Sequence, residues 1–218
     1  MPLVLEHGDV FFAYRPRVGE DHAGGLEDIQ RLWILLSPRG RPLHRRLVIG
    51  KKRLPRRGQR HWGYVEQVAS DPVRLVDDLH ETHYWTKTRG MRRQAIARAA
   101  GEGVYALAAD EDDGNVRLIY RLELPEHIGD VQRELGIADE GAYIATAFAT
   151  SGRRKFRPVV PDLLDVVGTE FILIAAVDDL GVHLDVDRVI ADSADIFRGL
   201  AVEDSDNPLR PLFEGLWA

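Results

Sequence analysis

Apolar and polar residues alternate over short stretches in residues 1–70, and this two-residue period predicts β-strands joined by turns. In the stretch 61–68, Trp62 and Tyr64 alternate with polar neighbours, as in a strand that is half buried. Three further strands are expected at 9–15, 31–36 and 46–50. The front of the chain therefore predicts a β-sheet rather than a helical bundle.

Helical patterns are fewer and shorter than strand patterns. Asp71 suits an N-cap and Pro72 the first helical position, so a helix is expected to begin there. Its buried face would consist of Val73, Val76 and Leu79. The basic segment Met91–Ala100 also predicts a helix, and Pro125 precedes a third helix, which is expected to end at Gly136.

The second half of the chain returns to strand patterns. Residues 104–108 and 117–123 flank the acidic stretch 110–114, which predicts a hairpin. Further strands are expected at 142–148 and 171–177, and a short helix near 193–200. Because 171–177 is apolar throughout, we expect this strand to be covered on both faces.

Strand signals outnumber helix signals, and long crossover helices are missing. The pattern predicts an α+β fold with a largely antiparallel β-sheet or a partly open barrel and a few short helices. We expect a basic β-rich half over 1–100 and an acidic α+β half over 101–218, with one continuous domain as the alternative.

Composition narrows the class of protein. Apolar residues make up 44% and charged residues 29% of the 218 residues, which is typical of an ordinary soluble globular protein. The start of the chain does not resemble a secretory signal, and the apolar run 171–177 is far shorter than the roughly 20 residues that cross a bilayer. We therefore expect a cytoplasmic protein without membrane contact. The chain has no cysteine, which excludes disulfides, thiol nucleophiles and cysteine-held metals.

Charge is distributed unevenly along the chain. Residues 1–100 carry 19 basic and 11 acidic residues, a formal charge of +8, whereas residues 101–218 carry 10 and 24, a charge of −14. Within the front half, the segment 39–60 contains ten cations and no acid, and eight of the ten are arginine. Arginine suits phosphate because its planar guanidinium donates two parallel hydrogen bonds.

A phosphate-binding face is therefore one interpretation of the basic segments. Its candidate residues are Arg45, Arg46, Lys51, Lys52, Arg53, Arg56, Arg57, Arg60, Lys87, Arg89, Arg92 and Arg93. Aromatic residues lie close by in the sequence, and single-stranded nucleic acid stacks its bases on such rings while its phosphates meet cations. The stacking candidates are Trp62, Tyr64, Tyr84 and Trp85. A third basic group comprises Arg153, Arg154, Lys155 and Arg157.

The sequence gives little support for a metal site, a P-loop or a catalytic serine. His80, Glu81 and His83 lack the spacing of a zincin helix, and no phosphate-binding P-loop pattern occurs. No serine lies in a nucleophile elbow. We therefore expect no metal and no cofactor, and no catalytic residue can be assigned.

Two resemblances add to this interpretation. The segments GDVFFAYRPRVG, IGKKRLP, TKTRG and GEGVYAL, with LELPEHIGDVQRELGI downstream, resemble an uncharacterised family of conserved bacterial hypothetical proteins. That resemblance implies a bacterial cytoplasmic protein and nothing about activity. The segments GDVFFAYR and WGYVEQVASDP are similar to parts of the β-barrel domains of the PUA-like and EVE type, which bind RNA or modified bases.

The leading hypothesis is a non-enzymatic binding module for RNA, DNA or another polyanion. One alternative is an enzyme that acts on a phosphorylated small molecule, with the same cations holding the phosphate. Another is a structural subunit of a protein assembly, in which the oppositely charged halves dock onto neighbours. The first hypothesis requires that the arginines of 39–60 remain accessible and are not neutralised inside the fold.

Overall fold

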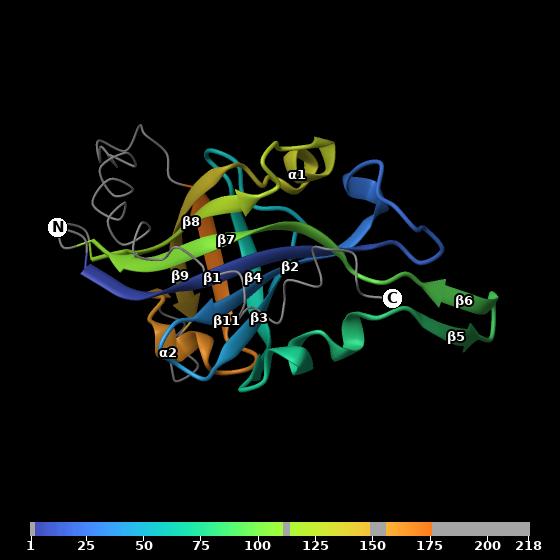
Figure 1. The fold of residues 1–218 in the computed structure, drawn as a ribbon, viewed down its shortest axis with the longest axis horizontal. Coiled ribbons are helices and arrows are strands. Elements are labelled where there is room, and N and C mark those ends of the chain that lie inside the picture. Colours follow the sequence, from blue (N-terminus) through green and yellow to red (C-terminus); the bar gives the residue numbers. More distant parts are fainter. Residues whose placement is uncertain (1–2, 111–113, 149–155, 176–218) are drawn as a thin grey trace.

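Eight strands close into an antiparallel β-barrel (Figure 1). The computed structural model describes residues 3–110, 114–148 and 156–175. The barrel strands are β1 (Leu3–Pro16), β2 (Ile29–Pro38), β3 (His44–Ile49), β4 (Arg60–Ala69), β7 (Arg98–Ala109), β8 (Val116–Leu124), β9 (Glu140–Phe148) and β11 (Glu170–Ala175). Around the barrel they follow the order β9–β11–β4–β3–β2–β1–β7–β8, and pairing of β8 with β9 closes the ring.

The remaining elements are short and lie around the barrel. They are β5 (Thr82–Thr86), β6 (Gly90–Gln94), β10 (Phe156–Pro158), α1 (Asp130–Leu135), α2 (Pro161–Leu164) and the 3-10 helices η1 (Leu26–Asp28), η2 (Pro72–Leu75) and η3 (Asp77–Leu79). β10 adds to the edge of β9, and β5 and β6 form a separate two-stranded hairpin. Among the described residues, no helix has the length and apolar character needed to cross a membrane.

The barrel interior is filled by side chains. The ring of Phe12 meets that of Tyr120 edge to face, with ring centroids 4.8 Å apart. Gly63 lies against this interior, and its position leaves no room for a side chain. A β-carbon there would lie 2.5 Å from both Cζ of Phe171 and the carbonyl oxygen of Val48. The core is therefore packed closely around that glycine.

A second apolar cluster covers part of the outside of the barrel. Phe11, Trp33 and Val48 point outward from β1, β2 and β3, and they are buried by Leu75 and Leu79 from η2 and η3. Asp71 caps η2 as the sequence predicts, since its side chain accepts a hydrogen bond from the Val73 amide. Val76 and Leu79 are buried as predicted, whereas Val73 is exposed and Leu75 is buried instead.

The fold confirms the largely antiparallel sheet and the few short helices. The barrel is closed rather than partly open, and the protein is mostly β, so α+β describes it only coarsely. Both halves of the sequence supply barrel strands, β1 to β4 from residues before 100 and β8, β9 and β11 from residues after it. The helix expected near 193–200 and the end of the strand 171–177 lie outside the described residues.

The helix predicted for Met91–Ala100 is wrong. Residues 90–94 form β6, which pairs with β5, and Arg98 begins β7, where it pairs with Tyr14 on β1. Gly90 takes a left-handed conformation with φ of 67° and completes the turn between β5 and β6. Cross-strand pairing here outweighs the helical propensity of the local sequence.

Candidate nucleic-acid interface

The basic segment 39–60 divides into two parts in the structure. Arginines before β3 and within it are paired with carboxylates, whereas the cations of the loop between β3 and β4 are exposed or half-buried. The two parts therefore have different chemical roles.

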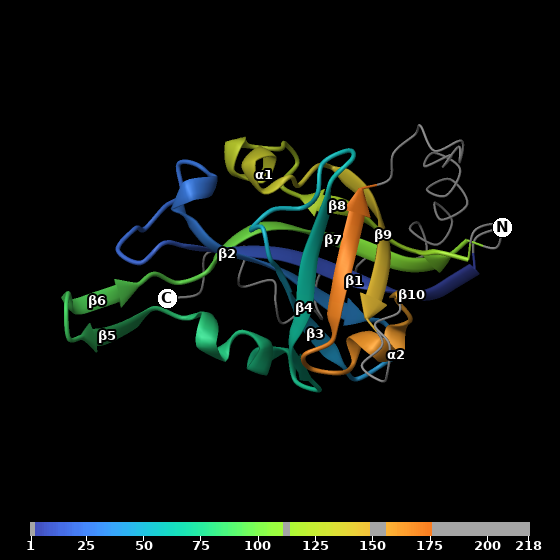
Figure 2. The same ribbon diagram turned by 180° about the vertical axis from the view of Figure 1, so that it is seen from behind.

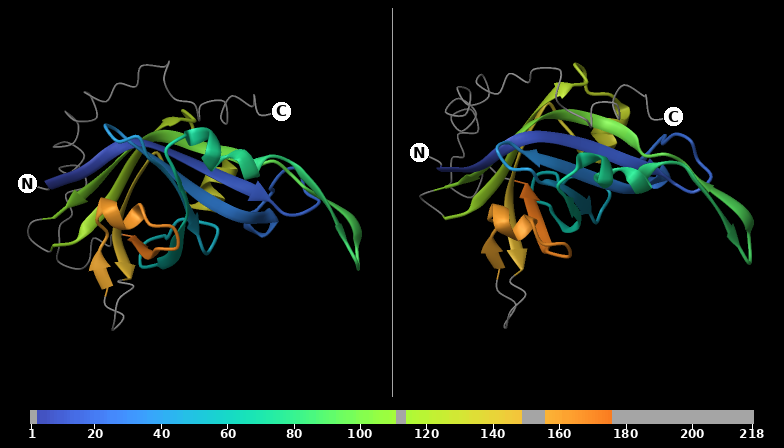
Figure 3. Two further views of the ribbon diagram at one scale, coloured as in Figure 1. Left: turned by 90° about the horizontal axis from the view of Figure 1, so that it is seen from below. Right: turned by 60° about the horizontal axis from the view of Figure 1, so that its bottom comes forward.

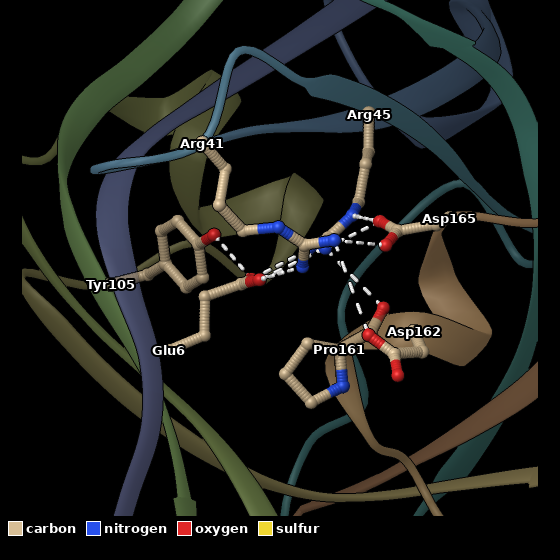
Figure 4. Close-up of polar contacts among 7 residues, drawn as sticks. All are labelled: Glu6, Arg41, Arg45, Tyr105, Pro161, Asp162 and Asp165. Atoms are coloured by element: carbon tan, nitrogen blue, oxygen red, sulfur yellow. Dashed lines mark hydrogen bonds and ion pairs between the residues drawn. The ribbon is translucent and has the colours of Figure 1, made fainter.

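Arg45 lies at the centre of a buried polar cluster at one end of the barrel (Figure 4). Its guanidinium donates to both oxygens of Glu6 over 2.5 and 2.9 Å, and its Nε donates to Asp165 over 2.7 Å. The hydroxyl of Tyr105 also donates to Glu6, over 2.7 Å. Burial, followed by the charge of Glu6, raises the pKa of Tyr105 well above its usual value, so this hydroxyl stays a donor.

Arg41 completes the cluster from the loop between β2 and β3. It donates to Glu6 over 3.2 Å and to Asp165 over 2.5 Å. Arg41 also lies 4.0 Å from a carboxylate oxygen of Asp162 on α2. Two arginines thus meet three carboxylates, and the pairs tie β1, β3, α2 and the segment after α2 together at the barrel end (Figure 4). Carboxylates compensate both cations of this arrangement, and its role is structural.

Arg46 points to the outer face of β3 and is also enclosed. It contacts Glu66 over 2.8 Å and both oxygens of Asp78 over 2.5 and 2.9 Å. Its guanidinium carbon lies 5.8 Å from the ring centre of Trp33, whose indole nitrogen donates to Glu66 over 2.7 Å. Burial opposes ionisation of Asp78, but the hydrogen bonds and charge of Arg46 outweigh it and lower the Asp78 pKa.

The structure therefore removes Arg45 and Arg46 from the predicted phosphate-binding face. Their exposed fractions are 0% and 3%, so a large anion cannot reach either guanidinium. Arg39 and Arg41, which belong to the same basic segment, pair with Asp9 and with Asp165. Asp165 comes from the acidic half, so part of the basic segment is neutralised inside the fold.

Five cations of the loop between β3 and β4 differ from the arginines before and within β3. Within the described residues, no carboxylate lies within ion-pair distance of Lys51, Lys52, Arg53, Arg56 or Arg60. Three of these five cations donate to neutral acceptors. Lys52 donates to the carbonyl of Ile29, Arg53 to the amide oxygen of Gln59, and Arg56 to the carbonyl of Arg133. Arg57, another predicted residue, is exposed at the same loop.

The backbone of this loop is fixed at several points. The amide of Leu54 donates to the carbonyl of Leu135 at the end of α1, and the side chain of Leu54 is fully buried. His61 Nδ1 lies 2.7 Å from the carbonyl oxygen of Arg53, so this nitrogen carries the hydrogen and donates it. Burial first, and the nearby charge of Lys51 as well, lower the pKa of His61, which keeps the ring neutral at pH 7.

The outer face of β4 continues from this loop with Arg60, Trp62 and Tyr64. The three residues alternate with buried His61, Gly63 and Val65, so all three point outward. Trp62 is 45% exposed and Tyr64 is 36% exposed. In Figure 2, β4, β11 and β9 run side by side across the face of the barrel.

Trp62 is held in place by a residue that sequence reasoning missed. The rings of Trp62 and Phe148 are stacked, with centroids 4.7 Å apart and planes 5° from parallel. β11 lies between the strands that carry them, so the two rings meet above β11. Alternation along 142–148 would have placed Phe148 outward, but the pairing of β11 with both β4 and β9 could not be inferred from the sequence.

The hairpin carries the second group of predicted residues. Tyr84 and Trp85 lie on β5, Lys87 and Arg89 lie on the exposed turn, and Arg92 and Arg93 lie on β6. Arg93 pairs with Asp21 and Glu81, and Arg92 donates to the carbonyl of Val18. Figure 3 shows the hairpin extending away from the barrel, so the structure does not bring these residues to the outer face of β4. In the third basic group, Arg157 is exposed on β10, and Arg153, Arg154 and Lys155 lie outside the described residues.

Comparison of the chain with protein-family models, with curated proteins and with solved structures gives no match. Both resemblances noted from the sequence therefore stay predictions. The function rests on the geometry of the described residues.

Proposed function

We propose that this protein binds single-stranded nucleic acid on the outer face of β4, with the loop between β3 and β4 meeting the phosphates. We call this surface the β4 face, and it comprises Lys51, Lys52, Arg53, Arg56, Arg60, Trp62 and Tyr64. The observation that carries the proposal is the exposure of Trp62 and Tyr64 directly beside cations that have no carboxylate partner among the described residues. Exposed rings stack on bases of any sequence, and adjacent cations neutralise the backbone.

A single strand fits this surface better than a duplex does. In a duplex the faces of the bases are hidden in the stack, so Trp62 and Tyr64 would have nothing to stack on. The platform is also preorganised, because Phe148 supports one face of Trp62 before any ligand arrives. Preorganisation lowers the entropic cost of binding.

The test is a titration of labelled single-stranded and double-stranded oligonucleotides with the wild-type protein and matched variants. We expect Trp62→Ala to weaken single-strand binding about tenfold, since stacking contributes about 1–3 kcal/mol per base. Trp62→Phe retains an aromatic ring and should stay close to wild type. The logarithm of the association constant should fall with the logarithm of salt concentration by about 0.7 per phosphate contacted.

A charge-matched pair of variants serves as the control. Arg60→Ala removes a cation from the β4 face, whereas Arg74→Ala removes one from η2, beyond the opposite end of β4. Both side chains are exposed, and neither forms an ion pair within the described part of the chain. Only Arg60→Ala should reduce affinity and the salt slope. Equal effects of the two substitutions, or no single-strand binding at low salt, would contradict the proposal.

A further inference from the structure

The β5–β6 hairpin is a projecting arm with features of a ligand-binding element. Figure 3 shows it projecting from the barrel, and both of its strands are edges because no third strand of the described chain pairs with them. Its base is anchored: Gln94 donates to the carbonyl of Pro16 over 3.0 Å, and Arg93 pairs with Asp21 and Glu81. The arm therefore projects in a defined direction.

The tip of the hairpin is ordered as well. The Thr86 hydroxyl donates to the carbonyl of Gly90 over 3.1 Å and accepts from the Arg89 amide over 3.1 Å. The ring of Trp85 reaches toward this turn, since a β-carbon on Gly90 would lie 3.8 Å from its Cη2. Trp85 is nevertheless 73% exposed. A large aromatic ring is thus held at the tip without being covered by the described residues.

The charge of the hairpin indicates which kind of partner its tip binds. Between Thr82 and Ala97 the chain contains no acid, and the two acids at the base, Asp21 and Glu81, are paired with Arg93. Lys87 and Arg89 occupy the turn itself and form no ion pair within the described residues. A polyanion complements this tip.

The position of the charges favours nucleic acid over a membrane. A hairpin that inserts into a bilayer would carry apolar residues at its turn, whereas this turn consists of Lys87, Thr88 and Arg89. Insertion would desolvate both cations. With nucleic acid the same cations meet phosphates while Trp85, just behind them, reaches a base.

We infer that the hairpin is a second contact for the same nucleic acid, in which Trp85 stacks on a base and Lys87 and Arg89 bind phosphates. This inference rests on the proposed function of the β4 face. Two linked contacts on one strand raise affinity without any new interaction at either, provided that the strand is long enough to reach both. The hairpin should therefore matter for long strands only.

The experiment compares single strands of about 6 nucleotides, which one site can hold, with strands of about 30 nucleotides, which exceed one site. Wild type, Trp85→Ala and Lys87→Gln/Arg89→Gln are titrated with both, with Val73→Ala as a control that trims an exposed apolar side chain elsewhere. We expect the hairpin variants to lose about tenfold in affinity for the long strand and less than about twofold for the short one. Val73→Ala should bind both strands as wild type does.

The outcomes separate this inference from the proposed function. If wild type binds neither strand, the proposed function fails and the hairpin has no site to supplement. If wild type binds both and the hairpin variants bind equally well at both lengths, only the hairpin inference fails. It also fails if the variants weaken short and long strands alike, or if they lose binding to vesicles with anionic lipid while nucleic-acid binding is unchanged.

Discussion

At the scale of single residues, the buried charge of Arg45 largely determines how stable this end of the barrel is. Removing a buried charge leaves its partners unpaired in a medium of low polarity, which costs far more than losing an exposed pair. Glu6 is 7% exposed and depends on Arg45, Arg41 and the Tyr105 hydroxyl for its hydrogen bonds. A single substitution in the cluster is therefore expected to destabilise the protein strongly.

We expect Arg45→Met to lower the free energy of unfolding by about 3–5 kcal/mol, because Glu6 remains buried without its main cation. The double variant Glu6→Gln/Arg45→Met carries no uncompensated charge at Glu6 and should recover part of the loss. Arg133→Ala breaks an exposed pair with Asp130 and should cost about 1 kcal/mol or less. Urea unfolding measures all three, and an Arg45→Met protein as stable as Arg133→Ala would refute the structural role.

Two histidines, His61 buried and His44 half-buried, make stability depend on pH. Burial lowers the pKa of His44 and of His61 below the ordinary value of 6.5. Below that value the unfolded chain binds protons that the folded chain does not, so the free energy of unfolding should fall as the pH drops from about 7 toward about 5. The variant His44→Asn/His61→Asn removes both groups and should show a shallower fall over this range in urea unfolding. An unchanged pH dependence in the variant would exclude these histidines as its source.

At the scale of elements, the sequence predicts strands better than it predicts which charges are free. The alternation in 61–68 predicts a half-buried strand but not the face on which Trp62 and Tyr64 lie, and the structure places both outward. The acid-free segment 39–60 looks uniform in the sequence, yet its front part is neutralised by Glu6, Asp9 and Asp165. Glu6 gives a local signal, as an acid within an apolar strand. Asp165 lies 120 residues from Arg45, and no local pattern links them.

The hairpin illustrates a different limit at this scale. Met91–Ala100 has good helical propensity, but its conformation is set by the left-handed Gly90 and by pairing with β5 and β1. Strand partners outside the segment determine whether it forms a strand or a helix, because cross-strand contacts contribute more to stability here than the local helical preference does. The predicted phosphate-binding face joins the two basic segments, but the structure separates them because this hairpin extends away from the barrel (Figure 3).

At the scale of the whole molecule, closure of the barrel creates the β4 face. β4 comes from the front half, whereas β11 and β9 come from the rear half, and their pairing brings Trp62 over β11 to Phe148. Neither half alone supplies this platform. The sequence predicts an antiparallel sheet, but the order of its strands, and with it the site, follows only from the full set of pairings.

The most direct measurement of the central claim is the indole N–H spectrum of the protein during titration with a short single-stranded oligonucleotide. The chain has four tryptophans, and Trp→Phe variants assign their signals. Trp33 is an internal control, because it is 2% exposed and its indole nitrogen is hydrogen-bonded to Glu66. We predict that the Trp62 signal shifts on binding while the Trp33 signal does not. A bound oligonucleotide that leaves the Trp62 signal in place would contradict the assignment of the β4 face as the binding surface.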